Sequence, residues 1–190
     1  MSDFFDPPPP FEPEPPVPDW DGPPDGVLPV TIPIERIVAR TDAAVVYLAA
    51  LVAYPTGFQA DVFVLTDGTD PDLDPFDYGY RDTGRRTGEI PPGQLRLGFA
   101  FANGSKATNT GAYFNLHGWD EDSGGPPDAP VMSGGLGGGN EGSWHTTLWV
   151  WPLPPPGALQ FVCEWPAAGI PQTRVDLGAA SLLDAADRVS

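Results

Sequence analysis

Cysteine and lysine are almost absent from this sequence, which has one of each, Cys163 and Lys106. A single cysteine cannot form an internal disulfide, so the chain is not a small disulfide-stabilised domain. Histidine is also rare, with His117 and His145 the only two. No spacing such as Cys-x-x-Cys or His-x-x-x-His is present, and we therefore expect no metal site and no cofactor.

Basic residues are scarce as well. Nine lysines and arginines stand against 26 aspartates and glutamates, which gives a formal net charge of −17. Nucleic acids and anionic membrane surfaces bind clusters of Lys and Arg, so neither is an expected partner. The negative charge favours solubility or a basic protein partner, and an unknown protein partner stays open.

Long apolar runs are missing too. None approaches the length of about 18 residues that a membrane-spanning helix needs. The first residues, "MSDFFDPPPPFEPEPP", have neither the basic region nor the apolar region of a secretory signal. These patterns predict a cytoplasmic protein.

Proline and acidic residues dominate residues 1–26, which contain ten prolines, seven acids and no base. Such a segment buries too little apolar area to offset the entropy lost on ordering. We expect a disordered, acidic, proline-rich tail, followed by one domain over residues 27–190. The aromatic residues of the tail leave a second interpretation open, a docking peptide for a basic or aromatic-lined groove.

Strand patterns begin after residue 27. "AAVVYLAALVAYPTGFQADVFVLT" has two apolar runs around a tight connection at residues 55–57, which predicts a β-hairpin. A helix competes for residues 43–53, and Pro55 with the strand pattern after it favours a strand. Alternation places one set of side chains on a common face: Phe58, Ala60, Val62 and Val64.

Two further segments carry strong strand signals. Asn103-Gly104 predicts a second hairpin, because these residue types accept the backbone angles of a tight turn. In "ALQFVCEWP", alternation places four residues on one side: Leu159, Phe161, Cys163 and Trp165. This pattern explains the cysteine as a small buried hydrophobe.

The remaining chain is made of loops and a short end. Residues 67–93 and 109–142 are rich in Gly, Pro and acids, and we expect long loops there. A last strand over residues 173–177 and a short helix over residues 179–190 complete the pattern. Together these signals predict an all-β fold, an antiparallel β-sandwich of about seven or eight strands with a short C-terminal helix.

Three segments also carry a family resemblance: "RTDAAVVYLAALVAYPTGF", "LGFAFANGSKATN" and "WVWPLPPPGALQFVCEWPAAGIPQTR". With the acidic proline-rich start, they resemble a family of uncharacterised proteins from actinobacteria. The resemblance implies a similar compact β-rich fold and a GC-rich bacterial source. It brings no activity and no catalytic residue.

The motif "DSGGP" at residues 122–126 is similar to the nucleophile segment of trypsin-like serine proteases. Glu121 stands where those enzymes have a glycine, and His117 lies only six residues before Ser123. A loop rich in Gly, Pro and Asp produces such strings by chance. We therefore expect no enzyme. A hydrolase with a loop-borne site around Ser123 stays open as an alternative.

Three other motifs resemble functional sites. Cys163 paired with a histidine would need an exposed, acidic thiol, which the strand pattern does not favour. The loop over residues 67–82 lacks an EF-hand pattern. It still offers four carboxylates for weak calcium binding, those of Asp70, Asp72, Asp74 and Asp77. Residues 134–140, "GGLGGGN", almost match a dinucleotide-binding loop, and we expect a flexible loop there.

The last alternative is a carbohydrate-binding module, in which exposed tryptophans would stack on sugar rings. The candidate residues are Trp144, Trp149, Trp151 and Trp165. Packing in the core or at an edge is the more frequent use of Trp. The function that the sequence favours is thus a non-enzymatic interaction module, with the hydrolase and the carbohydrate-binding module as alternatives. The sequence assigns no catalytic, cofactor-binding or metal-binding residue.

Overall fold

The computed structural model describes residues 18–68, 73, 75, 89–111, 127–128, 130–140 and 142–189. These residues form nine strands, a 3-10 turn η2 (Pro166–Ala168) and a short helix α2 (Ala180–Ala186). The strands are β1 (Val30–Arg40), β2 (Ala44–Ala53), β3 (Phe58–Thr66), β4 (Arg96–Phe101), β5 (Lys106–Thr108), β6 (Val131–Asn140), β7 (Ser143–Trp151), β8 (Leu159–Trp165) and β9 (Ile170–Asp176).

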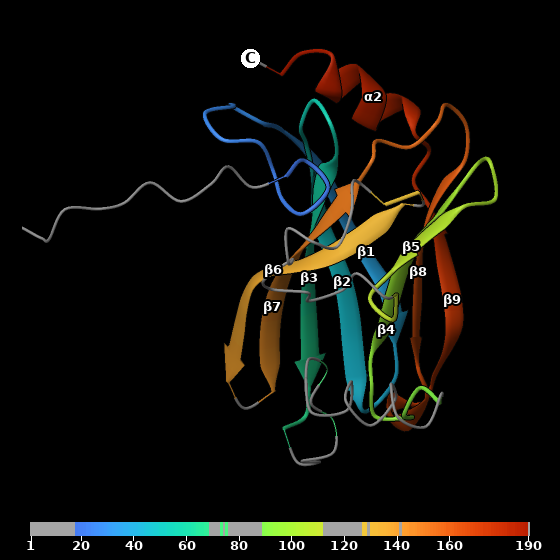
Figure 1. Cartoon of the computed structure of the whole chain (residues 1–190). Coiled ribbons are helices and arrows are strands. Elements are labelled where there is room, and N and C mark those ends of the chain that lie inside the picture. Colours follow the sequence, from blue (N-terminus) through green and yellow to red (C-terminus); the bar gives the residue numbers. More distant parts are fainter. Residues whose placement is uncertain are drawn as a thin grey trace, which may run out of the picture.

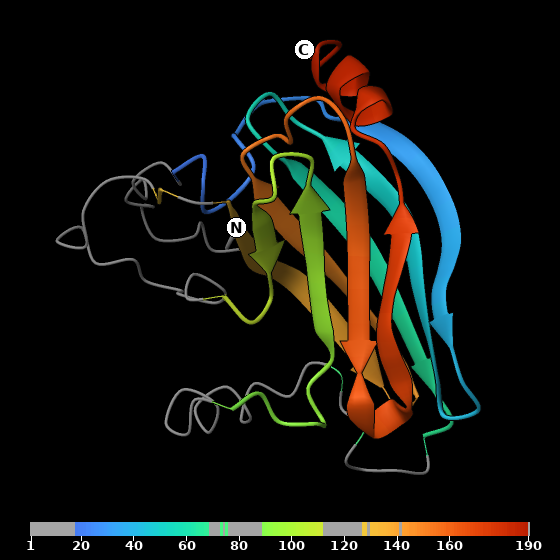
Figure 2. The ribbon, with the colours of Figure 1, turned by 90° about the vertical axis from the view of Figure 1, so that its right-hand side faces the viewer.

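Two antiparallel sheets pack face to face. The five-stranded sheet has the order β1-β2-β3-β7-β6 and the four-stranded sheet the order β5-β4-β8-β9. Figure 1 shows α2 at one end of the sandwich, where it contacts β1 and β2, and Figure 2 views the four-stranded sheet in front of the other. The predicted antiparallel β-sandwich is confirmed, with nine strands instead of seven or eight.

Both predicted hairpins are present. β2 and β3 pair from Ala53 and Phe58 outward, so the connection at residues 55–57 is as tight as expected. β4 and β5 are joined through Asn103 and Gly104, and only the glycine takes a positive φ, of 84°. The first hairpin also excludes the competing helix over residues 43–53.

The core lies between the sheets and follows the predicted alternation. The inward residues of β3 are fully buried, and so are those of β8, Cys163 among them. The Phe58 ring meets the Phe99 ring edge to face at 4.9 Å between centroids, and Phe99 lies 5.1 Å from Phe161. Because Phe58 belongs to β3 and Phe99 to β4, these rings join the two sheets.

Asn109 directly follows β5 and is buried, with only 4% of the residue exposed. Its Oδ1 accepts a hydrogen bond from the Leu97 amide at 2.8 Å, and its Nδ2 donates to the Leu95 carbonyl at 2.8 Å. One side-chain amide thus replaces the backbone pairing that a longer β5 would supply to β4.

The prediction of a long loop over residues 109–142, with a flexible stretch at 134–140, is wrong for residues 131–140, because these residues form β6 and pair with β7. Glycine has a low strand propensity, which hides the strand in the sequence. The glycines fit because β7 leaves little room: a Cβ on Gly139 would overlap the Trp144 ring, and one on Gly137 would lie 2.9 Å from the His145 carbonyl.

At the C-terminal end, β9 begins at Ile170, three residues before the predicted strand, and η2 precedes it. The predicted helix is present as α2, which is shorter than expected and buries Leu182 and Ala185. Within the described ranges, no helix is long and apolar enough to cross a membrane.

The burial of Phe161 generates a stability test. Phe161→Ala should lower the free energy of unfolding by about 3–5 kcal/mol, because it removes a buried ring and leaves a cavity. Val162, the next residue, lies on the partly exposed opposite face, so Val162→Thr should cost much less. Urea unfolding of both variants measures the difference, and equal losses would contradict the strand register.

Two neighbouring glycines of β6 supply a second test. Gly139→Ala should destabilise the protein by about 1–3 kcal/mol, as overpacking does, because the new methyl overlaps the Trp144 ring. Gly138 has no heavy atom within 4 Å of its Cβ position, so Gly138→Ala is the matched control and should be neutral or slightly stabilising. Thermal unfolding checks both, and a neutral Gly139→Ala would refute the close approach of the two strands.

Candidate binding surface

A row of four side chains crosses the outer face of the five-stranded sheet. The strand registers align one residue from each of β1, β2, β3 and β7, which together form the aromatic row: Ile37, Tyr47, Phe63 and His145. Val62 and Val64 point into the core, so Phe63 between them points outward. The row therefore follows from the same alternation that builds the core.

Apolar groups in this row remain open to solvent. Ile37 is 50% exposed and Phe63 is 38% exposed. Leu65, two residues after Phe63 on the same face, is 48% exposed. Three of the five large exposed hydrophobic residues in the described part of the chain thus gather on one sheet face. Clusters of this kind, with a polar border, are typical of interaction sites.

The rings of the row pack on one another. Phe63 and His145 stack with centroids 4.4 Å apart and an interplanar angle of 30°. Tyr47 and Phe63 lie 6.4 Å apart at 57°. Phe63 consequently turns one ring face toward His145, and the rings form a ridge of mutually tilted planes.

Asp61 supplies the polar border. Its Oδ1 accepts a hydrogen bond from Thr147 Oγ1 at 3.0 Å and lies 4.0 Å from His145 Nε2. Burial, followed by the negative charge of Asp61, raises the pKa of the Tyr54 hydroxyl. A negative group therefore lies at the edge of the apolar row, where it favours a basic contact.

The other half of this sheet face is covered by the chain itself, through the N-terminal turn (residues 18–22). Trp149 Nε1 donates to the Asp19 carbonyl at 3.2 Å, and Ser133 Oγ donates to the Asp21 carbonyl at 3.1 Å. Trp20, between those two contacts, is only 9% exposed. Part of the segment expected to be a tail is thus packed on the domain, while residues 1–17 lie outside the described residues.

The four tryptophans do not form an open platform. Trp165 is fully buried and donates from Nε1 to the Gly93 carbonyl at 2.8 Å. Trp149 is 2% exposed, and Trp144 packs against the core. Trp151 is partly exposed. The other rings on this face are the exposed Phe63 and the partly exposed Tyr47 and His145. The sequence does not single them out as a group because three different strands supply them.

Cys163 and His145 are not brought together. His145 lies on the outer face of the five-stranded sheet, whereas Cys163 points inward from the four-stranded sheet and is fully buried. Burial, together with the Glu164 charge, raises the pKa of the Cys163 thiol to about 12. Nucleophilic cysteines need a lowered pKa, so this thiol is unsuited to such chemistry.

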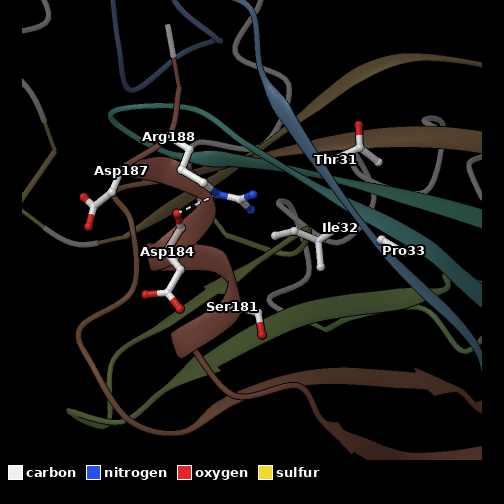
Figure 3. Close-up of a pocket in the computed structure, with 7 residues that line it drawn as sticks. All are labelled: Thr31, Ile32, Pro33, Ser181, Asp184, Asp187 and Arg188. Atoms are coloured by element: carbon white, nitrogen blue, oxygen red, sulfur yellow. Dashed lines mark hydrogen bonds between the residues drawn. The ribbon is translucent and has the colours of Figure 1, made fainter.

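A shallow hollow of about 650 Å³ lies between β1 and α2 (Figure 3). Its lining includes Ile32 and the charged groups Asp184, Asp187 and Arg188. Arg188 Nε donates to the Asp184 backbone carbonyl at 3.2 Å, and the two carboxylates do not converge on a common point in Figure 3. No group of three or more potential metal-ligating residues occurs among the described residues.

Several predicted candidates lie outside the described residues. These are Ser123 and His117 of the hydrolase alternative and the calcium-loop residues Asp70, Asp72, Asp74 and Asp77. Comparison of the chain with protein-family models, curated proteins and solved structures finds no match. The resemblance to actinobacterial proteins stays a prediction, and function has to be argued from the surface itself.

The buried thiol generates a chemical test. Cys163 should react with an aromatic disulfide reagent at pH 8 at least about a thousandfold more slowly in the native state than in denaturant, because its raised pKa keeps it protonated. When the pH is raised above 9, the labelling rate in denaturant should reach a plateau because the thiol is then ionised. The labelling rate of the native protein should continue to increase. A cysteine introduced by Gln172→Cys, at an exposed site, is the control and should react fast. Rapid native labelling of Cys163 would contradict its burial.

Proposed function

We propose that this protein is a non-enzymatic interaction module that binds a protein partner through the aromatic row and Leu65. The observation that carries the proposal is the exposure of Ile37, Phe63 and Leu65 together on one rigid sheet face. Water-exposed apolar area of this kind has a favourable free energy of burial against a partner. Aromatic side chains are also enriched among the residues that dominate binding energies.

The partner is a protein surface with an apolar centre and basic groups around it. Asp61 borders the row, and the chain carries a formal charge of −17. Such a field accelerates encounter with a positively charged partner and repels acidic surfaces.

Geometry favours a protein over a carbohydrate as the ligand. Sugar rings stack on open aromatic faces, whereas Phe63 turns one face to His145 and lies tilted to Tyr47. A ridge of tilted rings instead fits between the side chains of a protein surface. The hydrolase alternative around Ser123 and the cytoplasmic location remain predictions from the sequence.

Photo-crosslinking in the native host tests this proposal. A photoreactive phenylalanine analogue at position 63 should capture a specific protein, while the same analogue at Gln172, an exposed site on the other sheet, should not. Once the captured protein is purified, Phe63→Ala should weaken its binding about tenfold or more, as a central aromatic contact does.

The stability of the Phe63→Ala protein is the control for its expected loss of binding. Phe63 is partly exposed but packs on Tyr47 and His145, so Phe63→Ala should lower the free energy of unfolding by about 1–2 kcal/mol and leave the protein folded. Identical crosslinks at positions 63 and 172, or unchanged affinity of the Phe63→Ala protein, would refute binding through the aromatic row.

A further inference from the structure

The covered half of the outer sheet face has the features of an occupied peptide site. Trp149 and Val131 are 2% and 3% exposed, yet neither belongs to the core between the sheets. Their strand neighbours Leu148, Val150 and Met132 point into that core, so Trp149 and Val131 point outward. They are buried outside the core, on the face that the N-terminal turn contacts.

Three elements build the Trp149 groove, which we define by Tyr54, Gly57, Val131, Ser133 and Trp149. The Tyr54 ring meets the Trp149 ring edge to face at 5.5 Å and 78°. A Cβ on Gly57 would lie 2.6 Å from the indole, so the absence of a side chain in the β2–β3 turn makes room for the ring. The indole is therefore held in place by its own sheet.

The N-terminal turn is held as a short ligand is held. The amides of Asp21 and Gly22 donate to the Pro18 carbonyl at 2.8 and 3.3 Å, which closes a single helical turn. That turn presents the carbonyls of Asp19 and Asp21 to Trp149 Nε1 and Ser133 Oγ, and Trp20 between these two carbonyls is 9% exposed. Side-chain donors on backbone carbonyls, with one buried aromatic anchor, are a common mode of peptide recognition.

We propose that the Trp149 groove is a peptide-binding site that the chain's own N-terminal turn occupies. Its ligands are short peptides with a proline that starts a turn, a central tryptophan and flanking acidic residues. Trp149 Nε1 and Ser133 Oγ read the backbone carbonyls on either side of the tryptophan. The same groove accepts such a peptide from another molecule once its own turn is released. This site is separate from the aromatic row and does not depend on it.

Full-length Trp20→Ala protein tests this site, because loss of the anchor should release the turn. A fluorescent peptide with the sequence of residues 16–26, PVPDWDGPPDG, should bind the Trp20→Ala protein at least tenfold more tightly than the wild type, as measured by anisotropy. The same peptide with alanine in place of its tryptophan should lose that binding.

Two further variants, made in the Trp20→Ala protein, locate the binding. Trp149→Phe keeps a ring but removes the Nε1 donor, and should weaken the peptide about two- to tenfold, the effect of one hydrogen bond. Phe63→Ala is the control on the aromatic row and should leave peptide binding unchanged. Equal weakening by both would place the peptide on the other half of the face and overturn the assignment.

A second opening variant keeps the test decisive. Residues 18–22 replaced by a Gly-Ser stretch in the full-length chain should give a folded protein that binds the peptide like Trp20→Ala. If both opening variants fold and neither binds the peptide, the groove is not a peptide site. If neither variant folds, the N-terminal turn is a part of the fold rather than a bound ligand, and the proposal is equally overturned.

Discussion

The edge-to-face contact between Phe58 and Phe99 fixes the inner faces of both sheets against each other. Because side chains alternate along a strand, fixing Phe58 inward also fixes Asp61, Phe63 and Leu65 outward. The exposed surface is therefore set by the core: a shift of β3 by one residue would bury Phe63 and expose Val62 and Val64. The packed interior and the outer face therefore depend on the same strand register.

Local patterns were enough for much of this fold. The alternation through Phe161 and Cys163 identified a core strand, and Asn103-Gly104 identified a hairpin, because each signal depends on residues close together in the chain. The same pattern explained the single cysteine without assigning it a chemical role. Its burial and the raised pKa of its thiol agree with that interpretation.

Non-local pairing could not be inferred in the same way. β6 is a strand because Trp144 and its neighbours in β7 accept a partner without side chains, and nothing within residues 134–140 reports that partner. The aromatic row needs the registers of four strands before Phe63 and His145 become neighbours. The composition of residues 1–26 predicted a tail, and the composition gave no sign of the two carbonyl contacts that hold residues 18–22 on the domain.

Tethering sets the conditions under which the Trp149 groove is open. Only residues 22–29 separate Asp21 from the start of β1 at Val30, and a connection this short gives the turn a local concentration on the order of millimolar at the groove. A free peptide of equal intrinsic affinity competes only near that concentration. The tethered turn therefore outcompetes weak ligands at micromolar concentrations. Only peptides that bind much more tightly than this turn displace it from the groove.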